Sequence, residues 1–161
     1  MTEFERIYKE NYQIVYRYVL SLCQNAFLAE ELTQEAFVKA MEQMERFEGK
    51  CQLYVWICQI AKNTYYSFLR KQKHLAKEDP VSAQTAGPED AFLDREAAKQ
   101  IFHLMNQLPQ PYQEVFAQRV LGELSFSQIG VLHGKTDSWA RLVYYRAKKR
   151  IKEELDAEHI L

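Results

Sequence analysis

Apolar residues recur at every third or fourth position through most of the chain, which is the spacing of one face of an α-helix. The first run covers residues 4–22, and the second covers residues 32–47, where Gly49 is expected to end the helix. A third run covers residues 53–69. Together these runs predict a helical domain at residues 1–75.

The pattern is interrupted twice. We expect the third run to form two helical pieces that meet near Lys62 and Asn63. Residues 76–91 contain both proline and glycine and almost no large apolar residue, so they cannot bury enough surface to order themselves. This composition predicts a flexible linker, followed by a second helical domain at residues 92–161. A hydrophobic content of 47% with only five glycines and four prolines favours an all-α fold of two small domains.

The second domain ends in the pattern of a helix-turn-helix. Pro109 and Pro111 interrupt its helical spacing, a short helix is expected at Ser125–Leu132, and Gly134 marks a tight turn. Thr136 can cap the final helix through its side-chain oxygen. The inward face of that helix is expected to carry Ala140, Val143, Tyr144, Ala147 and Ile151.

The charges change the picture, because the net charge of −1 hides two basic blocks. Residues 49–77 contain six bases and no acid, and residues 135–152 contain seven bases against Asp137 alone. Like charge is costly to concentrate unless a partner neutralises it. The two blocks therefore indicate two surfaces that bind a polyanion such as nucleic acid.

The second basic block coincides with the final helix of the helix-turn-helix, which in such proteins lies in the major groove of DNA. Arg141 and Lys149 can reach guanine edges or phosphate oxygens from there. An ordinary solvated basic face is the alternative, which the preceding short helix and glycine turn disfavour. The outward face is expected to present Ser138, Trp139, Arg141, Leu142, Tyr145, Lys148 and Lys149.

The first basic block is interleaved with aromatic residues, a combination that suits single-stranded nucleic acid. Tyr54, Trp56, Tyr65, Tyr66 and Phe68 lie among Lys50, Lys62, Arg70, Lys71 and Lys73. Nucleotide bases can stack on the aromatic rings while the lysine and arginine side chains contact the phosphates. The amide of Asn63 could read an extruded nucleotide base. For Trp56, Tyr65 and Phe68, burial in the core is at least as good an interpretation.

The remaining residues favour a protein without catalytic, metal or membrane function. Cys23, Cys51 and Cys58 lack the spacing of a zinc site and are interpreted as buried thiols, with a redox or metal sensor as the alternative. No nucleophile–base pairing or phosphate loop is present, so we expect neither an enzyme nor a cofactor. No apolar run is long enough to cross a bilayer and the first residues lack a signal peptide, so we expect a cytoplasmic protein without membrane insertion.

Two long stretches resemble one known family. AFLAEELTQEAFVKAMEQMERFEGKCQLYVWICQIAKNTYYSFLRKQKH resembles the second conserved region of bacterial sigma factors of the extracytoplasmic-function group. LPQPYQEVFAQRVLGELSFSQIGVLHGKTDSWARLVYYRAKKRIKEEL resembles their fourth. Both occur in the family's order with its short linker between them. The chain departs from the pattern where Lys135 and Trp139 replace an aliphatic and a small residue.

The resemblance implies a role for each group of residues. Glu31, Gln34, Glu35 and Lys39 would bind the clamp coiled coil of the polymerase large subunit. The minus-ten element of the promoter would be melted and read by Trp56, Lys62, Asn63, Tyr66, Arg70 and Lys71, with Asn63 in a loop that captures a flipped base. The minus-thirty-five element would be read by Ser138, Trp139, Arg141, Leu142, Tyr145, Arg146 and Lys149.

The implied function is that of a transcription initiation factor, which directs RNA polymerase to particular promoters and helps to melt them. The implied partners are core RNA polymerase, contacted at the clamp and flap, promoter DNA, and an anti-sigma factor. The alternative is a stand-alone helix-turn-helix regulator that binds duplex DNA unaided, typically as a dimer on a palindrome.

Overall fold

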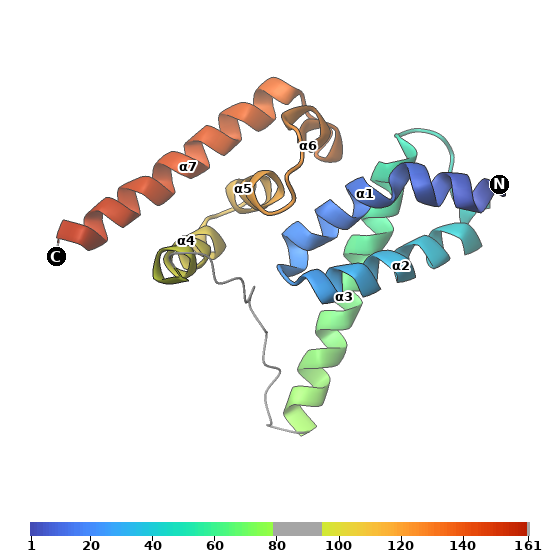
Figure 1. The fold of residues 1–161 in the computed structure, drawn as a ribbon, viewed down its shortest axis with the longest axis horizontal. Helices are drawn as coiled ribbons and strands as arrows, with labels where there is room; N and C mark the ends of the chain where they lie inside the picture. Colours follow the sequence, from blue (N-terminus) through green and yellow to red (C-terminus); the bar gives the residue numbers. More distant parts are fainter. Residues whose placement is uncertain (79–94, 161) are drawn as a thin grey trace. The chain divides into compact units, whose positions relative to one another are not determined.

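The computed structural model describes residues 1–78 and 95–160, and the chain forms two compact units, Met1–Glu89 and Asp90–Leu161. All regular elements of the described residues are helices (Figure 1). The predicted all-α fold is therefore confirmed. The expected flexible linker falls largely on residues 79–91, which lie outside the described residues, whereas residues 76–78 belong to a helix of the first unit.

The first unit is built from helices α1 (Glu3–Cys23), α2 (Ala26–Glu42) and α3 (Leu53–Glu78), with a 3-10 turn, η1, at Met44–Arg46. Each of the three helices packs against the other two. At its C-terminal end, α3 extends past α1 and α2 (Figure 1). Within the bundle, Ile57 and Ala61 of α3 are buried whereas Gln59 and Asn63 are exposed, so one side of α3 packs on α1 and α2 and the other faces solvent.

Local hydrogen bonds define where the first two helices begin. Thr2 and Glu5 form a reciprocal capping box at the start of α1, in which each side chain accepts from the other's backbone N–H at 3.1 Å. The Asn25 side chain accepts from the backbone N–H of Leu28 at 3.0 Å and so caps α2. Thr2 and Glu5 therefore fix the start of α1, and Asn25 fixes the start of α2.

The core of the first unit lies where the apolar faces of α1, α2 and α3 meet. Phe37 of α2 is 1% exposed, and the rings of Tyr8 and Tyr12 from α1 lie 5.0 and 6.2 Å from its ring. Val15 of α1 and Ile57 of α3 are completely buried. Burying large side chains of this kind stabilises the fold by about 1.5–3 kcal/mol each.

Two expectations for the first unit were wrong. The second helix was expected to run to residue 47, but α2 ends at Glu42 and a single 3-10 turn follows. The third run was expected to break near Lys62 and Asn63, but α3 is continuous. No glycine or proline interrupts α3, and the Thr64 hydroxyl donates to the Ile60 carbonyl at 2.8 Å within the helix.

The second unit consists of α4 (Arg95–Gln107), α5 (Tyr112–Val120), α6 (Phe126–Leu132) and α7 (Asp137–Ile160). As predicted, the region of Pro109 and Pro111 separates two helices, and the short helix precedes a long final one. One cluster of its core joins α4, α5 and α7 and contains the buried residues Leu104, Met105, Phe116, Ala117, Ala147 and Ile151. Ile129 of α6 is also completely buried.

The turn between α6 and α7 is the predicted helix-turn-helix turn. Gly134 has a φ of +67°, a left-handed conformation that favours glycine. The Thr136 hydroxyl accepts from the backbone N–H of Trp139 at 3.1 Å, which confirms the expected cap. The expected inward residues of α7 are also confirmed, because Ala140, Val143, Ala147 and Ile151 are buried and Tyr144 is half-buried.

A second glycine permits the close approach of α6 to this turn. A Cβ atom on Gly130 would lie 2.6 Å from the Thr136 carbonyl oxygen and 2.9 Å from that of Lys135. Both neighbours are backbone atoms next to the start of α7, so they cannot move without shifting the helix. Gly130 thus sets the distance between the two helices, although the sequence pattern drew attention only to Gly134.

We predict that Gly130→Ala destabilises the second unit by roughly 1–3 kcal/mol, because the added methyl overpacks against backbone. A Trp56→Phe background leaves Trp139 as the only tryptophan, so urea titration followed by tryptophan fluorescence reports this unit. Ser127→Ala is the matched control, since Ser127 is exposed on the same helix. Equal unfolding midpoints for the two variants would contradict the prediction.

Candidate nucleic-acid interface

The outward face of α7 carries most of the residues predicted to contact duplex DNA. Leu142 is 48% and Tyr145 is 54% exposed, although both are large and partly apolar. The structure therefore presents polar, cationic and apolar groups together on one helix face, as base edges in a major groove require. Also exposed on α7 are Ser138, Arg141, Arg146, Lys148 and Lys149.

Trp139 differs from the other predicted residues of this face, because it is only half-exposed. Its ring lies 5.3 Å from that of His133 in the turn before α7. The Nε2 atom of His133 lies 2.9 Å from Oε1 of Gln118, a side chain of α5 that is only 2% exposed. A polar chain from the core thus holds the turn and the first residues of α7 in place.

The exposed side of α3 brings together four residues predicted to bind an opened strand. Tyr66 lies four residues after Lys62 and three after Asn63, and Arg70 lies four after Tyr66, which places the four side chains on one side of the helix. The Nζ atom of Lys62 lies 5.9 Å from the Tyr66 ring, and Tyr66 is 40% exposed. We call this set the α3 stripe. It combines an aromatic face, an amide and two cations.

Asn63 does not lie in a loop, which corrects the role that the resemblance implied for it. It sits inside continuous α3, with its side-chain oxygen 3.5 Å from the amide of Gln59. Its side chain is exposed, so it remains available to a ligand. Any base that it contacts must approach the side of a helix rather than enter a loop of this region.

The remaining aromatic residues of α3, Tyr54, Trp56, Tyr65 and Phe68, are half-buried. Trp56 is half-buried and packs on Phe47, with ring centres 5.3 Å apart. Burial raises the pKa of the Tyr65 phenol, as expected for a ring turned toward the bundle. Lys71 is exposed, but its position along α3 lies outside the stripe. Trp56 and Lys71 are therefore not part of the set that the fold gathers.

The exposed side of α2 carries three of the residues predicted to bind the polymerase, Glu31, Gln34 and Glu35. Two apolar residues share this side and were missed by the sequence reasoning. Phe27 is 74% and Val38 is 53% exposed. With Glu31 and Gln34 they follow the spacing of one helix face, which was the signal that could have revealed them. We call Phe27, Glu31, Gln34 and Val38 the α2 ridge.

Lys39 was predicted with this group, but the structure gives it contacts inside the unit. Its Nζ atom lies 3.3 Å from Glu35 and donates to the hydroxyl of Thr64 at 3.2 Å. Thr64 is 4% exposed and belongs to α3. Lys39 therefore links α2 to α3, and its side chain is only partly accessible to a binding partner.

The cysteines do not all follow the prediction of buried thiols. Cys58 is 2% exposed and burial raises its pKa far above the usual range. Burial also raises the pKa of the half-buried Cys23, whereas Cys51 is exposed, contrary to expectation. Within residues 1–78 and 95–160, no group of histidine, cysteine and acidic side chains is placed to hold a metal ion.

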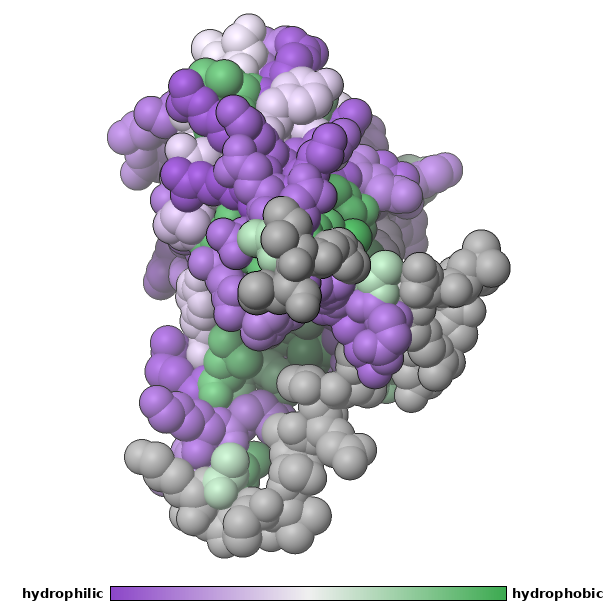
Figure 2. Space-filling model, turned by 90° about the vertical axis from the view of Figure 1, so that its left-hand side faces the viewer, coloured by the Kyte–Doolittle hydropathy of each residue, from purple (hydrophilic) through white to green (hydrophobic). Residues whose placement is uncertain are grey.

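The face shown in Figure 2 is mostly polar. Hydrophilic residues predominate on the face of the described residues that Figure 2 shows, with smaller hydrophobic areas between them. None of the helices in the described part of the chain is long and apolar enough to cross a membrane.

Comparisons with known proteins find similarity to sigma factors. A family model described as Sigma-70 region 2 matches residues 7–75, which cover most of α1, all of α2 and most of α3. The RNA polymerase sigma factor CarQ of Myxococcus xanthus is 26% identical over 94% of this chain and 88% of its own. The ECF RNA polymerase sigma factor SigM of Bacillus subtilis is 27% identical, with 92% of each chain covered.

Solved structures show the same fold. The sigma factor RpoE of Bartonella quintana, solved with the anti-sigma factor NepR, is 20% identical over 97% of this chain and 98% of its own, with a TM-score of 0.60. CnrH, solved with the cytosolic domain of CnrY, is 14% identical over 96% and 88% of the two chains, with a TM-score of 0.58.

We predict that the three thiols react in the order of their exposure. Cys51 should react first with a chromogenic aromatic disulfide, Cys23 more slowly, and Cys58 only after unfolding, because thiolate character and access both fall with burial. Stopped-flow absorbance resolves the phases, and Cys51→Ser should abolish the fastest one. A fast phase that persists in Cys51→Ser would refute this assignment.

Proposed function

Because this chain is a sigma factor of the extracytoplasmic-function group, a class of transcription initiation factors, we propose that its first unit binds core RNA polymerase and the minus-ten element while its second unit binds the minus-thirty-five element. The observation that carries the proposal is the similarity to sigma factors over about nine tenths of both chains, which includes both units. The two basic faces support it independently. In this proposal the chain selects the promoter, and the polymerase synthesises the RNA.

We assign polymerase binding to the α2 ridge together with Glu35. An exposed helix face that mixes large apolar side chains with carboxylates suits a partner helix with an apolar stripe and basic flanks. Phe27 and Val38 would supply apolar contact area, and Glu31 and Glu35 would set orientation. Lys39 contributes less in this assignment, since it already holds Thr64.

We assign the minus-ten element to the α3 stripe. Tyr66 offers a ring face on which an unstacked base can lie, and Lys62 and Arg70 can neutralise the phosphates of that strand. The side chain of Arg70 is oriented by the Ser67 hydroxyl, which lies 3.0 Å from its Nη2 atom. Asn63 supplies donors and an acceptor for a base edge. Trp56 and Lys71 would act at the margins of this surface.

We assign the minus-thirty-five element to the outward face of α7. Arg141 and Lys149 would contact guanine edges or phosphates, and Leu142 would contact apolar groups in the groove. Ser138, Tyr145 and Arg146 complete the surface, while Trp139 acts from its place beside His133. The minus-thirty-five duplex is thereby read by a helix whose opposite side is core.

We also propose that an anti-sigma factor controls the chain. Bartonella quintana RpoE has this fold and was solved with such a partner. The competing reading, a stand-alone helix-turn-helix regulator, accounts for α6 and α7 but gives the α2 ridge and the α3 stripe no role. The two readings differ in whether DNA binding needs the polymerase.

The test of the function is run-off transcription on genomic fragments. Core polymerase with the purified chain should initiate at discrete promoters, whereas core polymerase alone should not. A mobility shift on a selected promoter fragment should likewise require core polymerase, because the melted element is bound only within the holoenzyme. Tight and specific duplex binding by the chain alone, with no effect on initiation, would instead establish the stand-alone regulator.

Tyr66→Leu should slow promoter opening roughly tenfold, since one stacked base contributes about 1–3 kcal/mol. Permanganate reactivity of the melted thymines measures opening directly. Phe4→Leu removes a ring of nearly equal exposure, 39% against 40%, from α1 and serves as the control. Normal opening with Tyr66→Leu would remove the stripe from the proposed strand-binding surface.

A further inference from the structure

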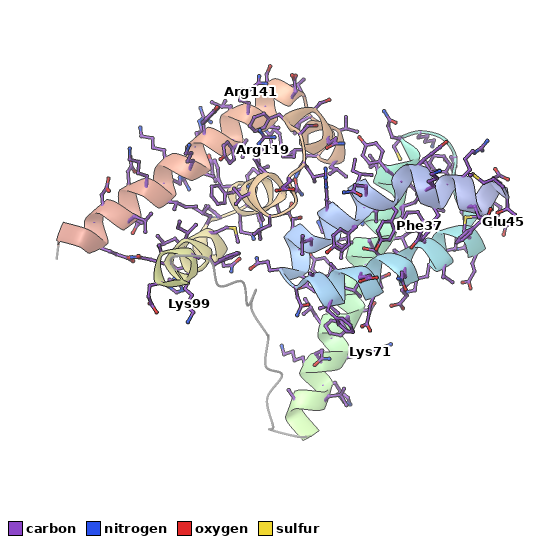
Figure 3. All side chains as sticks on the ribbon, in the orientation of Figure 1. Phe37, Glu45, Lys71, Lys99, Arg119 and Arg141 are labelled. Atoms are coloured by element: carbon purple, nitrogen blue, oxygen red, sulfur yellow. The ribbon has the colours of Figure 1, made fainter. Side chains whose placement is uncertain are left out.

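One phenylalanine in the second unit lies against two arginines from different helices. Phe126 is the first residue of α6. The guanidinium carbon of Arg119, on α5, lies 4.2 Å from the centre of its ring, and that of Arg141, on α7, lies 5.1 Å from it. Both distances are within the range of a cation–π interaction. Figure 3 labels the two arginines on their separate helices.

The ring has further contacts besides the two arginines, among them the ring of Tyr145 on the outward face of α7, whose centre lies 6.5 Å away. The Nη1 atom of Arg119 donates to the carbonyl of Leu124 at 3.0 Å, and Leu124 is completely buried. The ring of Tyr144, on the inner side of α7, lies 5.6 Å from the Phe126 ring. Phe126 therefore packs against Tyr144 and against Arg119, which is itself hydrogen-bonded to the backbone of buried Leu124.

Arg141 is in a different situation, because it is exposed. Among the residues that the structure describes, it forms no ion pair with a carboxylate, and its recorded contact is the Phe126 ring. A free arginine side chain populates many rotamers, and ordering it on binding costs free energy. Contact with a fixed ring reduces the number of rotamers before DNA arrives.

The arrangement also leaves the positive charge of Arg141 available. A carboxylate partner would orient the guanidinium but would compete with phosphate or guanine for its donors. An aromatic ring attracts the cation through its face and accepts none of the N–H groups in the plane of the guanidinium. A second cation, Arg119, against the same ring makes this spot still more favourable for an electronegative group.

We propose that Phe126 is a positioning residue for DNA recognition, which holds Arg141 ready to contact the promoter without lying in the groove itself. The proposal rests on the proposed function, in which the outward face of α7 binds the minus-thirty-five element. It extends the recognition surface to α6 and, through Arg119, to α5.

A double-mutant cycle tests the coupling. Holoenzyme is assembled from core polymerase and each of four chains: the wild type, Phe126→Leu, Arg141→Ala and the double variant. Equilibrium binding is measured on a promoter fragment selected by run-off transcription. Arg141→Ala should weaken binding by about fivefold to a hundredfold, the range for one lost base contact. Phe126→Leu should weaken binding by about twofold to fivefold when Arg141 is present, and by much less when Arg141 is absent, since only the contact with Tyr145 then remains to be lost.

Conservative variants separate positioning from folding. Phe126→Tyr keeps the ring and should bind like the wild type, whereas Phe126→Met, which keeps an apolar side chain without a ring, should behave like Phe126→Leu. Urea titration in the Trp56→Phe background shows whether each second unit is folded at the assay temperature. If Phe126→Leu is unfolded, Phe126→Met takes its place in the cycle.

The possible results distinguish an error in the positioning role of Phe126 from an error in the proposed function. An equal loss from Phe126→Leu with and without Arg141 would overturn the positioning role and indicate a structural one. Wild-type binding by both Phe126→Leu and Phe126→Met would overturn it as well. If Arg141→Ala itself binds normally while the wild-type chain supports run-off transcription, the promoter contact of Arg141 is wrong and the positioning role falls with it, but the function stands.

Discussion

Both candidate DNA surfaces depend on one constraint, which is that α3 and α7 are each buried along one side only. A unit of this size has too few residues to surround a long helix, so only one apolar stripe per helix can be removed from water. Ile57 and Ala61 face the bundle on α3, and Ala140 and Ala147 do so on α7. The opposite sides must remain in solvent, and there the basic residues are placed. Fold and function therefore use complementary halves of the same helices.

The second general feature is how the concentrated positive charge is accommodated. The two ion pairs found within the described residues, Lys39–Glu35 and Lys50–Glu48, leave the bases of α7 without a carboxylate partner. Aromatic rings take that place at several positions. Arg150 lies 4.3 Å from the ring of Tyr112, and Lys62 lies near Tyr66. Rings orient cations without neutralising them, so the positive potential that attracts a polyanion is kept.

Comparing α6 and α7 with α3 shows which features of the fold could be predicted from neighbouring residues. The helix-turn-helix was predictable because the left-handed glycine and the threonine cap determine the backbone of the few residues next to them. The break expected near Asn63 was wrong, because nothing in the local sequence required it and packing against α1 and α2 favours a continuous helix. The end of α2 was wrong for a related reason, since a helical spacing of apolar residues can continue into a 3-10 turn.

The sequence by itself determined the helical class, the division into two units, the helix-turn-helix and the location of both basic blocks, because hydrophobic spacing, caps and charge are properties of neighbouring residues. It also supported the family resemblance that the comparisons extend over both units. Only the tertiary structure decided which side chains of each block stand together. In the structure, Lys39 donates to Thr64, Trp139 packs on His133, and Phe126 contacts Arg141. Those contacts depend on how successive helices pack against each other, which the local spacing of hydrophobic residues does not reveal.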